Sequence, residues 1–284
     1  KQPYVSMIHD MAITQQHVVI PCGGYVTSKE RLARGEIHWG WDKSKPSCIG
    51  IMPRGGNSDD LRWFKGPERC MMHILNARTV GEQVILDAPF WDSNFFPFFP
   101  NVDGSPFEPA RARAFIRRLT FDLSSNHDEW HEEILFEEAV SDLARIDDRY
   151  ASLDYRYAFT ARHDETKPAA QTGSFGGKVA RAMNSYARFD VRSRTLESVH
   201  VGDNHQLQEC CFIPRSPDAA EGDGWLMGVA TNLDALRSEL VIIDTARLSD
   251  GVIARVILPH VIGSQVHGTW LSQDQIEQAR SAQG

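Results

Sequence analysis

Short apolar or alternating runs with the length of β-strands dominate the chain. They lie at residues 17–21, 48–52, 83–87, 114–121, 155–160, 185–190, 208–213, 224–230, 238–244 and 254–258. Gly, Pro and Asp separate the runs, as in Pro53-Arg-Gly-Gly and Gly222-Asp-Gly. Helical periodicity is confined to residues 28–34 and 274–282. Many short strands at fairly even spacing predict an all-β fold, which could be a sandwich, a barrel or a propeller.

One hairpin pattern recurs and favours the propeller. A strand ends in an Asp, turns through a few polar residues and returns as a second strand, within residues 115–136, 185–200 and 240–258. Recurrence of one supersecondary unit at a roughly constant period is typical of repeat architectures, and propeller blades are built from such hairpins.

Composition limits the classes of function. The 284 residues carry 30 Lys+Arg and 38 Asp+Glu, a formal charge of −8, so we expect no nucleic-acid partner. The chain contains no stretch of about 18 apolar residues, so we expect no membrane-spanning helix. An odd number of cysteines without a CxxC pair favours a reduced, cytoplasmic protein without a thiolate zinc site. The cysteines are Cys22, Cys48, Cys70, Cys210 and Cys211.

The first residues read as the middle of a domain. Lys1 is followed within a few residues by an apolar run at Val5–Ile8, which predicts a buried strand, and no initiator Met or leader pattern precedes it. We therefore expect a chain that starts inside a domain. The alternative is a compact protein whose first element is a strand.

The segment from Phe90 to Pro100 is rich in aromatic residues and in proline. Its prolines argue against a central strand. One interpretation is an aromatic plug that seals the core, and the other is an apolar wall beside a hydrophobic substrate.

Three of the eleven histidines share a distinctive context. Most histidines are satisfied structural or surface residues, but His9, His73 and His267 each follow an apolar run and precede a short motif. Imidazoles that reach one place from separate strands provide the neutral nitrogen donors that suit Fe(II). There is no HExxH motif, so a zinc protease is poorly supported.

The residues around these histidines resemble the carotenoid cleavage oxygenase superfamily, and within it the bacterial lignostilbene dioxygenases. The resemblance runs from residue 5 to about residue 271. It is carried by the segments 7–14, 72–77, 221–226 and 266–270, with further agreement at 142–147, 211–215 and 240–244.

The resemblance implies a seven-bladed β-propeller with a loop and helix cap over the metal face. In this family one Fe(II) per complete propeller is bound by four histidines. His9, His73 and His267 match three of them, and the fourth lies in the family at a position upstream of Lys1. We therefore expect residues 1–284 to form the C-terminal part of a single oxygenase domain, supplying the later blades. The N-terminal portion of the same protein would supply the others.

The resemblance also implies carboxylates that orient the imidazoles. Glu221 matches one of these positions, although a carboxylate in the turn Glu221-Gly-Asp-Gly has an ordinary structural explanation. Asp142 lies where the family usually has Glu, one methylene short. The third carboxylate would lie outside this chain.

The implied reaction is cleavage of an alkene C=C bond with O2 to give two aldehydes, without an organic cofactor. The expected substrate is a small apolar phenol, most simply a 4-hydroxystilbene. Alternatives are another phenylpropenoid such as isoeugenol, a carotenoid or an apocarotenoid. A non-catalytic propeller that only binds a partner is the alternative from another class. Both a monomer and a homodimer are compatible with these expectations.

Overall fold

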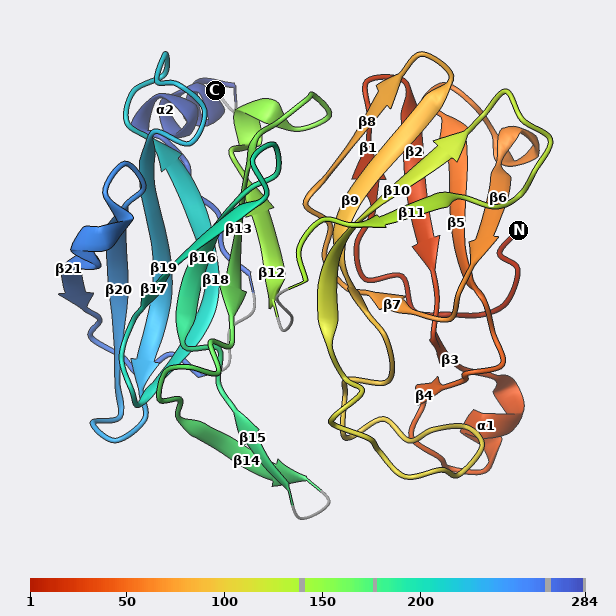
Figure 1. The fold of residues 1–284 in the computed structure, drawn as a ribbon, viewed down its shortest axis with the longest axis horizontal. Coiled ribbons are helices and arrows are strands. Elements are labelled where there is room, and N and C mark those ends of the chain that lie inside the picture. The colour runs from red at the N-terminus through yellow and green to blue at the C-terminus, as the bar shows by residue number, and fades with distance from the viewer. Residues whose placement is uncertain (138–140, 176–177, 264–266, 283–284) are drawn as a thin grey trace.

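The computed structural model describes residues 1–137, 141–175, 178–263 and 267–282. In this part of the chain the strands form four larger antiparallel sheets. Figure 1 shows the sheets side by side, from the first (red and orange) to the last (blue). The described helices are all too short to cross a membrane.

The first two sheets come from the first half of the chain. The first has the order β1-β2-β5-β6, from Ala12–Ile13, His17–Cys22, Ser47–Pro53 and Arg62–Gly66. The second contains β11 (His131–Ile134), β10 (Ala114–Asp122) and β9 (Gln83–Trp91). Two short strands, β7 (Cys70–Met71) and β8 (Asn76–Val80), pair with the free side of β9.

The other two sheets come from the second half. The third has the order β12-β13-β16-β17, from Ser141–Ile146, Tyr157–Arg162, Ser185–Asp190 and Thr195–His200. The fourth has the order β18-β19-β20-β21, from His205–Pro214, Gly224–Asn232, Arg237–Asp244 and Val252–Ile257. Short 3-10 turns lie at Ser58–Asp60, Asp148–Tyr150 and Leu248–Asp250.

The remaining elements lie outside these sheets. They are the pair β3 (Tyr25–Val26) and β4 (Gly40–Trp41), the hairpin β14 (Gln171–Phe175) and β15 (Lys178–Arg181), and the helices α1 (Lys29–Ala33) and α2 (Gln273–Ser281). Both predicted helices are confirmed. β3, β4 and α1 lie together below the first two sheets in Figure 1.

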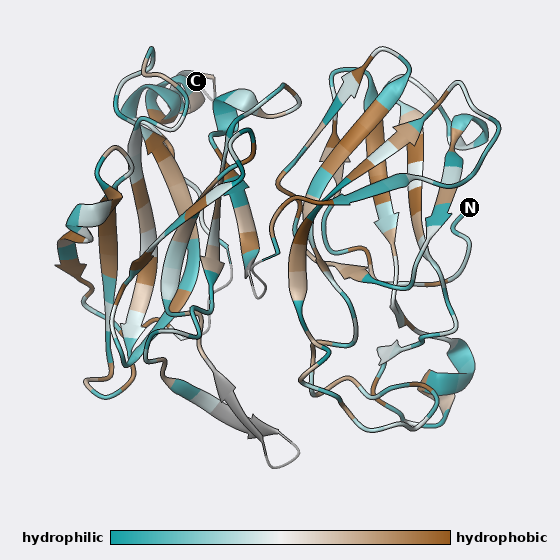
Figure 2. Ribbon diagram, viewed as in Figure 1, coloured by the Kyte–Doolittle hydropathy of each residue, from teal (hydrophilic) through white to brown (hydrophobic). Residues whose placement is uncertain are grey.

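Three hydrophobic clusters lie between neighbouring sheets, as stacked blades require. One cluster joins Val19 and Phe64 of the first sheet to Leu86 of the second. The next joins the second sheet to the third, and another joins Phe159 of the third to Phe212 of the fourth. In Figure 2 the central strands accordingly carry brown, apolar bands. Neighbouring sheets bury the faces that meet, whereas the outer strand β21 is largely exposed, and the propeller interpretation agrees with the structure.

The inner strands of three sheets are irregular where they meet near the middle of the molecule. In the second sheet a gap at residues 72–75 separates β7 from β8. In the third the register shifts between Asp142 and Arg145, and in the fourth between Leu207 and Cys210. Such irregularities turn side chains out of the regular alternation, so these strands can point polar groups toward the centre.

One local expectation is wrong. Residues 5–8 are not a buried strand: Val5 and Ile8 are 59% and 44% exposed, and Ser6 forms only an isolated bridge with Val26. The aromatic segment 90–100 is not a central strand, as expected: only Phe90 and Trp91 belong to the end of β9, and residues 92–100 lie outside the strands. Pro89 lies between the parts of β9 that pair with β7 and β8, so on that side no neighbouring strand requires its missing N–H.

Candidate metal centre

The three predicted histidines come together. His9 lies just before β1, His73 in the gap between β7 and β8, and His267 beyond β21. One nitrogen from each imidazole lies within 4.8 Å of the others, and the Nε2 atoms of His9 and His73 are 3.3 Å apart. Residues more than 250 positions apart in the sequence therefore present their nitrogens to one point.

A carboxylate holds His73 from behind. Nδ1 of His73 donates to Oδ1 of Asp142 at 2.7 Å, and both side chains are buried. Burial alone would lower the pKa of His73, but the hydrogen bond to Asp142 raises it. The shorter side chain at position 142 therefore reaches the imidazole directly and leaves Nε2 facing the centre.

Glu209 holds His267 in the same way. Nδ1 of His267 donates to Oε1 of Glu209 at 3.2 Å. The other oxygen, Oε2, accepts hydrogen bonds from the backbone N–H of Gly268 and from Arg145, both at 3.2 Å. Arg145 also donates to the carbonyl oxygen of Gly268 at 3.1 Å, which ties the segment after β21 to β12.

The prediction that Glu221 orients a histidine is wrong. Oε1 of Glu221 accepts hydrogen bonds from the backbone N–H groups of Arg156 and Tyr157, at 2.6 and 2.9 Å. It stands in the turn before β19, whereas the carboxylate beside His267 comes from the irregular part of β18. Glu221 is thus a turn carboxylate, the alternative explanation that its Glu-Gly-Asp-Gly context offered.

The sequence reasoning missed Glu209, although a signal was present. Glu209 stands in the run Gln208-Glu-Cys-Cys-Phe-Ile, where the residues from Cys210 to Phe212 are buried and apolar. A carboxylate inside a buried strand is rare unless it is paired. An isolated acid in an otherwise apolar run is therefore a useful pointer to a partner elsewhere in the fold.

His9 is held less tightly than the other two imidazoles. Its neighbour Asp10 accepts a hydrogen bond from the backbone N–H of Ile74 at 2.9 Å, which joins the segment of His9 to that of His73. Partial burial, together with the nearby imidazoles of His73 and His267, lowers the pKa of His9. A neutral imidazole is the form that binds a metal ion.

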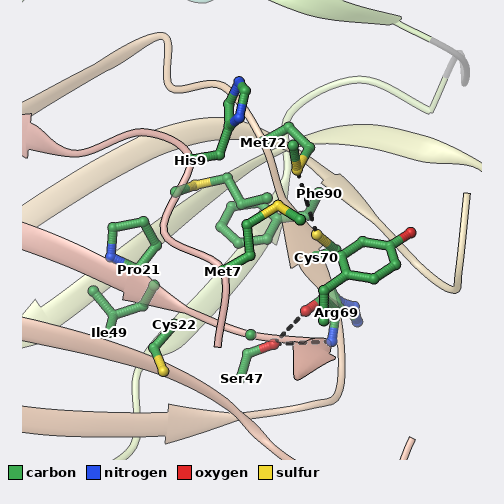
Figure 3. A pocket seen from close by; sticks show the side chains of 13 residues that line it. Met7, His9, Pro21, Cys22, Ser47, Ile49, Arg69, Cys70, Met72 and Phe90 are labelled. Atoms are coloured by element: carbon green, nitrogen blue, oxygen red, sulfur yellow. Dashed lines mark hydrogen bonds between the residues drawn. The ribbon is translucent and has the colours of Figure 1, made fainter. Parts of the chain in front are cut away.

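Two hollows adjoin the histidines. An open pocket of about 400 Å³ is lined by all three imidazoles and by Asp10, Arg145, Asp148 and Glu209, among others. A second, small cavity lies behind His9 (Figure 3). Its walls are largely apolar and rich in sulfur, with Met7, Cys22, Cys70 and Met72, and with Cys70 and Met72 in sulfur contact at 3.9 Å. The imidazoles thus lie between an open, polar pocket and an apolar interior.

The aromatic segment 90–100 forms the core of a cap. Phe95, Phe96 and Phe99 pack around Tyr25. The hydroxyl of Tyr25 donates to Asn94 and accepts from the backbone N–H groups of Phe95 and Phe96. These contacts favour the plug interpretation over a bare substrate wall.

The other histidines near the motifs have separate partners. Nδ1 of His17 is 3.0 Å from the hydroxyl of Thr79, and Nε2 of His205 is 3.0 Å from Glu239. In the described residues the three motif histidines are the one group of His, Cys, Asp and Glu that could hold a metal ion.

Comparison with known proteins identifies the family of the chain. The family model described as "Retinal pigment epithelial membrane protein" matches residues 1–272. Isoeugenol monooxygenase from Pseudomonas putida is 36% identical, over 96% of this chain and 56% of its own length. Lignostilbene-alpha,beta-dioxygenase isozyme III from Sphingomonas paucimobilis is 34% identical, over 94% of this chain and 55% of its own.

A solved structure agrees. The lignostilbene dioxygenase of Pseudomonas brassicacearum superposes with a TM-score of 0.87 at 33% identity, over 95% of this chain and 56% of that one. The chain spans about half the length of the curated relatives it matches. With a family match over most of its residues, the chain belongs to the retinal pigment epithelial membrane protein family, the carotenoid cleavage oxygenases.

Proposed function

We propose that the protein containing this chain is a non-haem Fe(II) oxygenase that cleaves an alkene C=C bond with O2 to give two aldehydes. The observation that carries the proposal is the convergence of the His9, His73 and His267 imidazoles in front of two carboxylates. The names of the relatives support the reaction class, because they are oxygenases of isoeugenol and lignostilbene.

The donor set fits Fe(II). Nδ1 of His73 and Nδ1 of His267 donate to carboxylates, so Nε2 is the acceptor nitrogen of each imidazole. Neutral imidazoles suit Fe(II), whereas a zinc site of thiolates would need cysteines at the centre. Iron bound there would supply the redox chemistry that lets O2 react with an alkene.

The residues of the chain would orient the site and exclude water. Asp142 and Glu209 fix the rotation of their imidazoles, and Arg145 fixes Glu209 in turn. Tyr25 of the cap lines the small cavity behind His9, together with Cys70 and Met72 of the same apolar cluster. A dry, apolar surrounding strengthens the electrostatic interactions inside it and prevents side reactions with water.

A small apolar phenol is the proposed substrate class, with a 4-hydroxystilbene first. The relative at 36% identity is an isoeugenol monooxygenase, so isoeugenol is the second candidate. Both candidates are small apolar phenols, and O2 uptake with each of them distinguishes the two.

The four sheets also fit a larger propeller. We propose that the four sheets are later blades of a seven-bladed ring, that the N-terminal portion of the same protein completes it, and that one Fe(II) binds per ring. The sheets stack face to face, and the relatives are nearly twice as long as the matched region.

The five free cysteines support action in the reducing cytoplasm.

The test uses the intact protein that contains this chain. Iron content and O2 uptake are measured with a 4-hydroxystilbene and with isoeugenol, and aldehyde products are identified. We expect bound iron, and O2 uptake that depends on the substrate. His73→Ala should lose both, whereas His260→Ala, at an exposed position outside the site, should lose neither. An iron-free protein without O2 uptake would reject the enzyme and favour a binding propeller.

A further inference from the structure

We propose that Trp91 is a positioning residue of the metal centre. Its indole N–H holds the second oxygen of Asp142, and Asp142 holds the imidazole of His73. The inference deepens the proposed function and rests on it insofar as His73 is a metal ligand. Neither the family motifs nor the sequence pattern assigned Trp91 a role.

The contacts form a short chain of buried groups. Trp91 is the last residue of β9, and its Nε1 donates to Oδ2 of Asp142 at 2.8 Å. Oδ1 of the same carboxylate accepts from His73 at 2.7 Å and from the backbone N–H of Leu143 at 2.9 Å. Trp91, Asp142 and His73 are 6%, 6% and 8% exposed. A carboxylate bound on both oxygens has one orientation, and so does the imidazole it holds.

The position of Asp142 makes this support necessary. The register of β12 shifts just after Asp142, and Leu143 has a φ of 54°, in the left-handed region that non-glycine residues rarely adopt. Without the indole, Oδ2 of Asp142 would stay buried but would lose this hydrogen-bond donor, which would destabilise the folded protein. The short Asp side chain would then rotate toward another donor and release His73.

Trp91 is itself held by the cap. Its ring stacks on Phe95 with centroids 4.3 Å apart and planes 15° from parallel. The backbone N–H of Phe95 donates to the hydroxyl of Tyr25 on β3. The packing of the aromatic plug is therefore connected, through Trp91 and Asp142, to the direction in which His73 points.

The experiment compares Trp91→Phe with Trp41→Phe in the intact protein. Trp41 is a buried tryptophan of the same cluster, 5.2 Å from Tyr25 between ring centroids. Fe(II) dissociation constants and the absorption spectrum of the Co(II)-substituted protein are measured, with thermal unfolding as a check of folding. For Trp91→Phe we expect about tenfold weaker Fe(II) binding, the lower end of the loss caused by removing a direct partner of a ligand imidazole, and an altered Co(II) spectrum.

A second variant and a metal-free crystal structure test the same series of contacts. Phe95→Leu keeps the indole but removes the stack, and we expect it to weaken Fe(II) binding by a smaller factor. In a metal-free crystal structure of Trp91→Phe, His73 should be turned from its present orientation. Unchanged metal affinity and an unchanged His73 would overturn the proposal. A parent protein that binds no metal would reject the proposed function, and the metal-free structure would still decide whether Trp91 orients His73.

Discussion

The groups that hold the imidazoles are each surrounded by hydrogen-bond donors. Asp142 receives N–H groups from His73, Leu143 and Trp91. Glu209 receives them from His267, Gly268 and Arg145. Only an ionised carboxylate can accept from all of these donors, since an amide would turn its own N–H groups toward at least one of them.

This difference predicts the effect of Glu209→Gln. The amide can still accept from His267, but its NH2 group then faces the N–H of Gly268 and the guanidinium of Arg145. We expect the Fe(II) dissociation constant of the intact protein to rise by about 10–100-fold. The matched control is Glu221→Gln, which removes a charge from a turn away from the imidazoles and should leave the Fe(II) affinity unchanged. Equal losses in both variants would contradict the assignment of Glu209.

At the scale of elements, the recurrent hairpin is a real unit with a defined turn. β10, β16 and β20 each end in an Asp whose Oδ1 accepts a backbone N–H two residues later. The residues are Asp122, Asp190 and Asp244. Their side chains close the turn into the outer strand of each blade, so the pattern seen in the sequence has a direct structural cause.

These turns predict a loss of stability in acid. Burial alone would raise the pKa of Asp190, but hydrogen bonds from Arg156 and from the backbone of Ser193 and Arg192 hold it well below its ordinary value. The pKa of Asp244 is also lowered, by the N–H of Ala246 and by Arg215, against the effect of burial. A group with a lowered pKa in the folded state stabilises the protein above its unfolded pKa of about 4. That contribution is lost as the pH falls from there through the folded pKa.

Asp190→Asn tests this sign. We expect the variant to be less stable than the parent by about 1 kcal/mol near pH 6, because the partner Arg156 is partly exposed. The difference should shrink steadily below pH 4. Urea unfolding from pH 6 to pH 2 measures it, with Asp218→Asn, at an exposed turn position, as the control. A difference that stays constant down to pH 2 would show that the charge of Asp190 is not responsible.

At the scale of the whole molecule, buried polar contacts join the blades as well as apolar packing. Asp87 on β9 is fully buried. Its carboxylate accepts two hydrogen bonds from Arg118 on β10, at 2.8 and 2.7 Å, and one from the hydroxyl of Tyr155, at 2.9 Å. Tyr155 stands just before β13, so this cluster connects the second sheet with the third.

Removing the Asp87 carboxylate should therefore lower the stability of the folded protein. We expect Asp87→Ala to lower the free energy of unfolding by about 3–5 kcal/mol, because Arg118 loses its buried partner. Tyr155→Phe removes one hydrogen bond to a charged group and should cost about 1.5 kcal/mol. Tyr157→Phe, whose hydroxyl is not bonded to Asp87, is the matched control. Urea unfolding of the intact protein measures all three, and equal values for Tyr155→Phe and Tyr157→Phe would contradict the role of the cluster.

The ten apolar or alternating runs, the repeated hairpin and the three histidines could be predicted from the sequence, whereas strands such as β6, β8 and β12 were missed. Strand alternation, the Asp turns and the motifs around His9, His73 and His267 are local patterns, so they can be read without knowing the fold. The same holds for α1 and α2. Asp142 was also found from its motif, although its reach to His73 needed the structure.

The groups that hold those histidines could be identified only from the folded structure. Glu209 and Glu221 are both carboxylates near strands, and no local pattern states which one faces His267. The choice depends on the register shift in β18 and on the approach of the segment after β21 to Glu209. Likewise, Trp91 meets Asp142 because β9 and β12 are neighbours in space, 51 residues apart in the chain. Such pairings between distant residues depend on how the sheets stack. They form only when the chain folds, so no local sequence pattern shows them.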